Sequence, residues 1–480
     1  MAMGTRREQQ EDLWIPSCAL ARSGGHPFYE GLNRVLAKHD FDGFVESRCR
    51  RFYAATMGRP SLAPGIYFRL LLVGYFEGID SERGISWRTG DSLSIREFVG
   101  IPLQEGAPDH TTISRTRRLI DVETHRQVFR WILELLASAG LVKGKRMGID
   151  ATNLEANAAL RSIVRRDDGQ SYEEFLKELA QQSGIATPSR EDLARVDRKR
   201  KKKGSNKEWV NSHDPDARIT RMKDGSTHLA HKAEHAVDMD TGAVIAVTVQ
   251  GADLGDTTTV KETLAEAGTT MAELIEREAQ IRPSEAPQVH LGGIEEVVAD
   301  KGYHSGPVLQ QMKAAGVRTY IPEKKQAGQR HWVGKQEERD AVYANRQRLQ
   351  RAKGKRLLRK RGELIERTFA HCYESGGMRR THLRQHNNIL KRLLIHVAGM
   401  NLGLLLRSVY GIGTPRGLQG LSRTVYFLCI WMARIEGWAN LQLFGVGVTA
   451  EAAVTPLYHL HLCAELTSLK IQKRPLTPGC

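Results

Sequence analysis

The spacing of apolar residues changes near residue 145 and divides the chain into a helical part and a mixed part. Before that point the apolar residues are dense at helical spacing, as in residues 65–75. A second helix is indicated after Asp109, a residue type that often caps helix starts. We therefore predict an all-α domain over residues 1–140.

Short strand patterns and turn signals follow this helical part. Residues 146–150 and 296–300 resemble strands, and each pattern ends in an aspartate. Residues 228–249 indicate a hairpin that turns at Asp240-Thr241-Gly242, and residues 318–322 indicate a last strand. The order strand, hairpin, helix, strand, helix, strand, helix matches a ribonuclease-H-like α/β fold, which we predict for residues 141–412. In that fold the first and fourth strands are neighbours.

Two polar segments interrupt the α/β pattern. Residues 160–225 are too hydrophilic for a core, so we predict an insertion that carries a basic run. Residues 325–362 are also basic; such a run alone indicates a solvated face or linker, but next to an acidic metal site we expect contact with the DNA backbone. Residues 413–480 have no assigned role. They hold the longest apolar run, residues 425–433, which is too short to cross a bilayer.

The charge balance narrows the class of partner. The chain has 71 Lys and Arg against 55 Asp and Glu, a formal net charge of +16. This excess favours a polyanion, because each phosphate neutralised by a basic side chain releases counterions. An anionic membrane surface is the competing partner. The six cysteines show no metal-ligand or CxxC spacing, which indicates reduced thiols in a cytosol.

Three acidic motifs are the candidate chemistry. Asp150 and Asp300 end strand patterns, and Glu363 and Glu366 lie three residues apart on a helical pattern. Carboxylates at two strand ends and on a helix can converge on divalent metal, and Mg²⁺ prefers such oxygen ligands. An acidic metal site in a basic protein is typical of an enzyme that cuts or joins nucleic acid.

Six segments of the chain resemble the DDE transposases of bacterial insertion sequences. They are RPSLAPGIYFRLLLVGYFEGIDSERGISWR with PDHTTISRTRR (59–88 and 108–118), DPDARITRMKDG (214–225), ADKGYHS (299–305), and ERTFAH with GGMRRTHLR (within 366–384). The resemblance covers roughly residues 12–412. It implies an opening helical domain that binds DNA and a metal-dependent catalytic core.

The resemblance implies a catalytic and metal-binding triad of Asp150, Asp300 and Glu366. One departure concerns the third acid. Relatives with a Tyr-x2-Arg-x3-Glu-x6-Lys signature have an Arg four residues before the Glu and a Lys seven after it, whereas Gly362 precedes Glu366 by four. Glu363 has Arg359 at that position, and neither glutamate has the Lys, so both glutamates stay candidates. We prefer Glu366 for its Glu-Arg-Thr-Phe context.

The resemblance also implies the reaction and the partners. The enzyme is expected to bind the ends of its insertion sequence, hydrolyse phosphodiester bonds with two Mg²⁺ (or Mn²⁺) ions, and join the 3′ ends to target DNA. We expect a homodimer on double-stranded DNA, no membrane association, and a cytoplasmic, nucleoid-associated bacterial protein. The alternatives are an inactive DNA-binding relative that acts as a repressor, and a ribonuclease-H-like nuclease without strand transfer.

Basic residues in three regions are the candidate DNA contacts, because guanidinium and ammonium groups bind phosphate. The predicted contacts are Arg115, Arg117, Arg118, Arg198, Lys199, Arg200, Lys201, Lys202, Lys203, Arg367, Arg379 and Arg380. His304 and Lys232 are weaker candidates.

Overall fold

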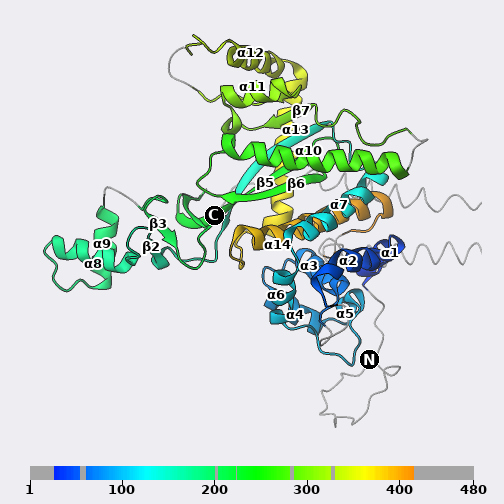
Figure 1. The fold of residues 1–480 in the computed structure, drawn as a ribbon, viewed down its shortest axis with the longest axis horizontal. Helices are drawn as coiled ribbons and strands as arrows, with labels where there is room; N and C mark the ends of the chain where they lie inside the picture. The colour runs from blue at the N-terminus through cyan, green and yellow to red at the C-terminus, as the bar shows by residue number, and fades with distance from the viewer. Residues whose placement is uncertain are drawn as a thin grey trace, which may run out of the picture. The chain divides into compact units, whose positions relative to one another are not determined.

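The fold is known from a computed structural model that describes residues 26–54, 61–200, 204–222, 224–281, 286–325, 330–413 and 415 (Figure 1). These residues belong to the first of two compact units, residues 1–416. The second unit, 417–480, lies outside the described residues, as does the apolar run 425–433.

Helices form the first part of the chain, as predicted. They are α1 (Pro27–Lys38), α2 (Phe41–Cys49), the 3₁₀ turn η1 (Arg50–Phe52), α3 (Pro64–Glu77), α4 (Glu82–Asp91), α5 (Leu93–Val99), α6 (His110–Leu119) and α7 (Val122–Ser138). Proline in the first turn and dense apolar residues explain α3, whose residues from Tyr67 to Phe76 are all buried. The Asp109 carboxylate accepts the Thr111 N–H at 2.8 Å and caps α6.

A six-stranded mixed sheet forms the centre of the second part. Its strands are β1 (Arg146–Glu155), β4 (Arg218–Arg221), β5 (Thr227–Asp238), β6 (Val244–Gly251), β7 (Glu296–Ala299) and β8 (Arg318–Tyr320). Strand β5 pairs antiparallel with β4, β6 and β1, whereas β1, β7 and β8 are parallel neighbours. The predicted hairpin and the predicted pairing of the first strand with the strand before Asp300 are both confirmed.

The predicted end of the first strand is wrong. Strand β1 does not stop at Asp150 but continues to Glu155, because Ala151–Glu155 pair with Ala230–Glu234 of β5. Asp150 therefore lies in the middle of β1. The parallel pairing of β1 with β7 ends just before Asp150, since its last pair is Ile149 with Ala299.

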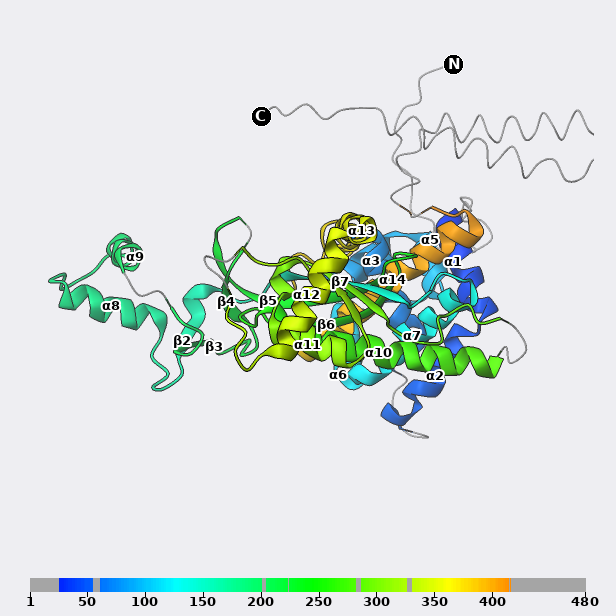
Figure 2. The ribbon, with the colours of Figure 1, turned by 90° about the horizontal axis from the view of Figure 1, so that it is seen from above.

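Helices cover both faces of the sheet (Figures 1 and 2). Glu234 bonds Thr259 of α10 (Asp256–Ile281), and its neighbour His235 lies 3.3 Å from the Thr368 hydroxyl of α13 (Ala352–Phe369). Consecutive strand residues point to opposite faces, so α10 and α13 lie on opposite faces of β5. The helices α11 (Gly306–Ala314) and α12 (Gln336–Gln350) flank β8.

Residues 336–369 correct the prediction of a basic linker. They form α12 and α13, and α13 places Leu357 against Val298 and Tyr320 of the sheet. The segment is basic overall, but it has an apolar stripe at helical spacing that packs on the sheet.

Helix α14 (His386–Tyr410) joins the two parts of the unit. It packs against α3 and α7, and the Asn401 amide bonds both the N–H and the C=O of Val244, at 3.0 and 2.8 Å. It thereby covers the outer edge of β6. Among the described helices, only α14 is long and apolar enough to cross a membrane, but 94% of its most apolar stretch is buried inside the protein.

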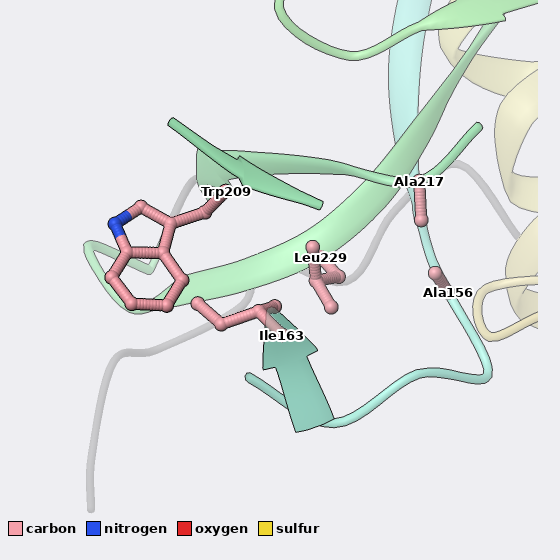
Figure 3. Close-up of a cluster of buried hydrophobic side chains, with 5 residues drawn as sticks. All are labelled: Ala156, Ile163, Trp209, Ala217 and Leu229. Atoms are coloured by element: carbon pink, nitrogen blue, oxygen red, sulfur yellow. The ribbon is translucent and has the colours of Figure 1, made fainter. Parts of the chain in front are cut away.

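The predicted insertion is present but has an apolar core of its own. It contains the 3₁₀ turn η2 (Leu160–Ser162), β2 (Ile163–Arg165), α8 (Tyr172–Gln182), α9 (Arg190–Lys199) and β3 (Trp209–Asn211). Trp209 packs with Ile163, Leu229 and two alanines (Figure 3), and its ring contacts Tyr172 and Phe175. The expectation that this segment is too hydrophilic for a core is therefore wrong.

Candidate active site

Asp150 and Asp300 lie side by side on neighbouring strands. Each directly follows the last parallel pair, Ile149 with Ala299, so their Cα atoms are about 4.8 Å apart, the usual spacing between strands. Asp300 also caps the 3₁₀ turn η3 (Lys301–Tyr303), and its Oδ1 accepts the Gly302 N–H at 2.7 Å. The register thus places two carboxylates at one edge of the parallel pairing.

The Asp150 carboxylate has a cationic neighbour that sequence reasoning missed. The Arg361 guanidinium of α13 forms a hydrogen-bonded ion pair with Asp150 Oδ2, while Oδ1 accepts the Ala151 N–H at 2.9 Å. Within the described part of the chain, the buried Nε of Arg361 has no hydrogen-bond partner. Arg361 belongs to a run of five basic residues among seven, so no sequence signal distinguished it from its neighbours.

Helix α13 crosses above Asp150 because Gly148 leaves room for it. A Cβ on Gly148 would lie 3.1 Å from Ile365 Cδ1 and 2.6 Å from Met239 Sδ. Asp150 is two residues further along β1 and points to the same face. A side chain at residue 148 would therefore displace the side-chain ends of Met239 and Ile365.

The two glutamates face different directions on α13. With about 100° per residue, Glu363 lies opposite Ile365, which faces the sheet, and Glu363 pairs with Arg367 at 2.7 Å on the exposed side. Leu364 lies near Gly242, in the turn beside the start of β1. Glu366 lies about 100° from Ile365 and Glu363 about 160°, so Glu366 is closer to the sheet-facing side of the helix. Both glutamates are exposed.

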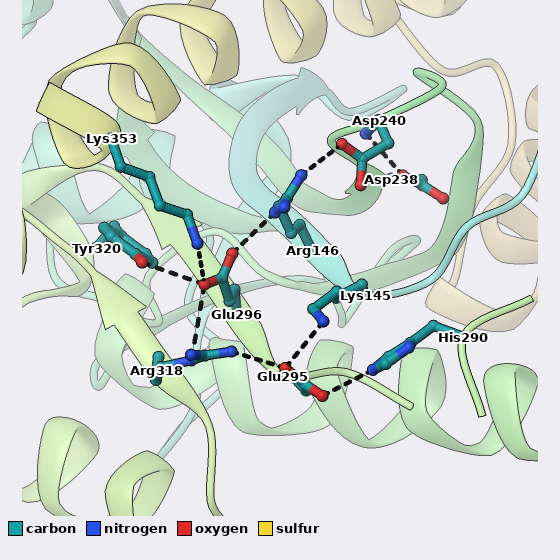
Figure 4. Close-up of polar contacts among 10 residues, drawn as sticks. All are labelled: Lys145, Arg146, Asp238, Asp240, His290, Glu295, Glu296, Arg318, Tyr320 and Lys353. Atoms are coloured by element: carbon teal, nitrogen blue, oxygen red, sulfur yellow. Dashed lines mark hydrogen bonds and ion pairs between the residues drawn. The ribbon is translucent and has the colours of Figure 1, made fainter. Parts of the chain in front are cut away.

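A buried glutamate fixes the start of α13 (Figure 4). Glu296 of β7 accepts hydrogen bonds from Lys353 Nζ at 2.5 Å, Arg146 Nε at 2.8 Å and the Tyr320 hydroxyl at 3.2 Å. Burial alone would raise the pKa of Glu296, but the hydrogen bonds from Lys353 and Arg146 outweigh it and lower the pKa. The helix is therefore anchored two turns before Arg361.

A second buried network supports the loop after Asp300 from the other face of the sheet. The Tyr303 hydroxyl donates to Glu234 Oε1 at 2.7 Å, and burial raises the pKa of Glu234. Lys232 Nζ donates to Asp256 Oδ1 at 2.6 Å, and Asp256 Oδ2 lies against Gly302. Lys232, a weak candidate for phosphate binding, is thus buried and occupied by these contacts.

Among the residues that the structure describes, no three Asp, Glu, His or Cys side chains are close enough to hold a metal ion. Asp150 and Asp300 are brought together, and Glu366 remains apart from them on α13. The donor chemistry nevertheless fits a divalent cation, because two carboxylates lie on neighbouring strands and one of them already pairs with a guanidinium.

The predicted phosphate ligands near the site differ in their surroundings. Arg379 Nη1 donates to the Thr152 hydroxyl at 3.3 Å, and Thr152 is on the same face of β1 as Asp150. Arg380 lies beside Glu155 at 3.6 Å, and Arg367 is held by Glu363. His304 is buried, and its Nε2 has no partner in the described residues. Arg379 is therefore the predicted contact nearest to Asp150 along β1.

Two of the predicted DNA contacts away from the sheet need correction. Arg117 is only 6% exposed and pairs with Glu82 at 2.7 Å, so it holds α6 against α4. Arg200 bonds Asp197 at 3.1 Å and stacks over Tyr172 and Phe175, so it belongs to the core of the insertion.

The other predicted basic contacts are exposed or lie outside the described residues. The exposed ones are Arg115, Arg118, Arg198 and Lys199; those outside the described residues are Lys201, Lys202 and Lys203.

Two family models match the chain. Residues 23–119 match a transposase domain (DUF772), and residues 207–402 match a transposase DDE domain. Together they span more than half of the sequence. Asp300 and Glu366 lie within the second match, and Asp150 lies between the two. No curated protein matches the chain.

The α/β core, its helical first part and these two matches define a metal-dependent enzyme that cleaves and transfers DNA strands. The chain belongs to the DDE transposases of the insertion-element type. DNA is its substrate, and divalent metal ions serve its chemistry.

Proposed function

We propose that Asp150, Asp300 and Glu366 are the catalytic acids and metal ligands of a ribonuclease-H-like core. The observation that carries this proposal is the register of β1 and β7, which makes Asp150 and Asp300 neighbours. The strand order β6-β5-β1-β7-β8, with an antiparallel hairpin followed by parallel strands, supports the assignment of this fold. The direction of Glu366 on α13 supports it over Glu363.

The residues of the chain have separate tasks in this proposal. Asp150 lies between the other two acids, Asp300 is held by the η3 turn, and Glu366 approaches from α13 when Arg361 leaves Asp150. Arg379 and Arg380 bind phosphates beside the reacting group. Mg²⁺ fits oxygen donors, and when bound it would activate the attacking hydroxyl and stabilise the leaving oxygen of an in-line displacement.

Several finer features stay predictions. They are Mg²⁺ as the specific ion with Mn²⁺ as a substitute, the homodimer on the two element ends, the association with the nucleoid, and domain boundaries at residues 140 and 412. The DNA contacts that we retain are Arg115, Arg118, Arg198, Lys199, Lys201, Lys202, Lys203, Arg367, Arg379 and Arg380.

Substitution of the three acids tests the assignment. Asp150→Asn, Asp300→Asn and Glu366→Gln should each lower strand cleavage by about a thousandfold or more, because one lost carboxylate removes several kcal/mol of transition-state stabilisation. Cleavage of a plasmid that carries the element ends, with Mg²⁺ present, measures this effect. DNA binding, followed in a gel-shift assay, should hardly change.

Glu363→Gln is the matched control, since Glu363 is on the same helix and faces solvent. It should cleave like the wild type. An active Glu366→Gln variant together with an inactive Glu363→Gln variant would move the third ligand to Glu363. Wild-type cleavage by Asp150→Asn or Asp300→Asn would remove that residue from the site.

A further inference from the structure

A polar crevice of about 490 Å³ lies where the starts of α4 and α6 meet the first turns of α14. Ser81, Arg83, Ser114 and Arg392 contribute to its wall. These residues come from segments that are far apart in the sequence, and none of them belongs to the active site described above. Arg392 is the most informative of the four.

Arg392 is a buried cation with unused donors. Its side chain is 3% exposed, and Nη2 donates to the Ile79 carbonyl at 3.0 Å. Its Nε and Nη1 have no partner among the described residues. Burial lowers the pKa of Arg392 to about 10. Buried donors without acceptors are costly, so this position calls for an acceptor from outside the chain.

The acidic side chains of the crevice already have partners. Glu82 pairs with Arg117 at 2.7 Å, and Asp80 pairs with His382 at 3.0 Å. Arg83, Arg117 and Arg392 outnumber Asp80 and Glu82 in the crevice wall, so the wall keeps an excess of positive charge that can attract an anion.

The backbone adds to this attraction. Helix α4 begins at Glu82 with Ser81 as its cap, and α6 begins at His110, so both helix starts border the crevice. First-turn N–H groups carry partial positive charge, and one of them in each helix is capped: the Gly84 N–H donates to Ser81 Oγ, and the Thr111 N–H donates to Asp109. An oxyanion with several acceptor atoms, such as a phosphate group, fits these donors and the fork of a guanidinium.

We propose that this crevice binds one phosphate group of the DNA backbone, with Arg392 as its buried ligand. The source of the phosphate rests on the proposed function, because a free phosphate ion has the same chemistry. The neighbouring surface suits a DNA strand: Arg83 and Trp87 are exposed one turn apart on α4, and Arg115 is exposed on α6. The crevice thus anchors DNA at the seam between the helical part and α14.

The salt dependence of DNA binding tests this site. The full-length protein would bind a fluorescein-labelled duplex of mixed sequence over a series of NaCl concentrations. Arg392→Gln should reduce the slope of log K against log salt by about 0.9, the value for one phosphate contact. It should also raise the Kd about tenfold at low salt, because a charge-assisted contact is lost.

Arg88→Gln is the matched control, since Arg88 is on α4 outside the crevice and pairs with Glu77 at 3.0 Å. It should keep the wild-type slope. If Arg392→Gln does not fold, Ser114→Asp tests the same wall by adding a carboxylate, and it should weaken DNA binding. Wild-type slopes in every folded crevice variant would overturn the proposal.

Inorganic phosphate distinguishes the two sources. Inorganic phosphate, added at constant ionic strength, should increase the melting temperatures of the wild type and of Arg392→Gln by the same amount. Stabilisation of the wild type alone, with an unchanged DNA slope in Arg392→Gln, would assign the crevice to free phosphate and overturn the DNA contact. We expect Asp150→Asn to keep its DNA binding. An experiment can therefore refute the catalytic assignment without refuting the phosphate site in the crevice, and the reverse.

Discussion

At the scale of single residues, Glu296 shows how a buried carboxylate can position chemistry that it does not touch. It lies beneath the start of α13 and receives hydrogen bonds from side chains of β1, β8 and α13. Arg361 and Glu366 follow on the same helix. Glu296 therefore helps to set the rotation of α13 over the sheet, together with the packing of Leu357 and Ile365.

Glu296→Gln should destabilise the fold by about 2–3 kcal/mol at neutral pH, because the amide cannot accept from all three donors as an ionised carboxylate does. The folded-state pKa of Glu296 is lowered below its ordinary value of 4.5. Its stabilisation is thus complete above about pH 4.5 and is lost as the pH falls through the folded pKa. Urea unfolding at several pH values should show the difference between variant and wild type shrinking in acid.

Glu295→Gln is the control for this prediction. Glu295 is the preceding residue and also binds basic partners, Arg318, Lys145 and His290, but at the surface. Its loss should change the unfolding midpoint little. Equal effects of the two substitutions would show that Glu296 has no special role in the anchor.

The sequence predicted part of the site at this scale. Asp300 ends a compact apolar strand, and its place is clear from the pattern alone. Asp150 was placed at a strand end because it closes a short apolar segment, although pairing with β5 extends the strand. Arg361 and Glu296 could not be found in this way, because the charged residues that hydrogen-bond with them lie 57 to 211 positions away in the sequence and leave no local pattern.

At the scale of elements, the insertion and α13 show why charged segments are easily mistaken for linkers. Both are rich in Lys and Arg, yet each has a few apolar residues at helical spacing that meet a partner: Leu176 with Leu193 in the insertion, Leu357 with Tyr320 under α13. The overall composition of such a segment does not reveal these few apolar positions. The hairpin and the parallel pair were predicted correctly because β6 and β7 carry short runs of β-branched residues and a Thr-Gly turn separates β5 from β6.

The insertion should unfold separately from the sheet when its central aromatic residue is removed. Trp209→Ala deletes the ring that packs against Tyr172, Phe175 and Ile163, a change that costs about 3–5 kcal/mol in a core. Hydrogen exchange should then become faster in α8 and α9. The amides of β1 and β7 should keep their protection.

Trp87→Ala provides the comparison, since Trp87 is 67% exposed on α4. It should leave exchange unchanged throughout. Faster exchange in β1 and β7 of the Trp209→Ala protein would mean that the insertion and the sheet unfold as one cooperative unit.

At the scale of the whole molecule, α14 makes the helical first part dependent on the end of the described chain. Seventeen of its 25 residues are buried, and it contacts α3, α7 and β6. Sequence patterns show that α14 is an apolar helix but not which elements surround it. The boundary predicted near residue 140 therefore separates two kinds of secondary structure that share a core.

A fragment of residues 1–140 should consequently fail to form a fixed tertiary structure. Without α14, the buried faces of α3 and α7 lose their cover, so we expect helical far-ultraviolet circular dichroism, weak near-ultraviolet signals and binding of a hydrophobic dye. Cooperative thermal unfolding and well-dispersed amide resonances of this fragment would contradict this expectation. Residues 1–416 should show both properties.

The position of α14 also sets an order of events during synthesis. About 250 residues separate the end of α7 from the start of α14, and ribosomes add roughly 5–20 residues per second, so the first helices wait some 10–50 s for their partner. A chain that stops early, after a frameshift or a premature stop codon, never completes the seam where α4 and α6 meet α14. Incomplete translation products of this transposase would therefore be poor competitors of the full enzyme for DNA.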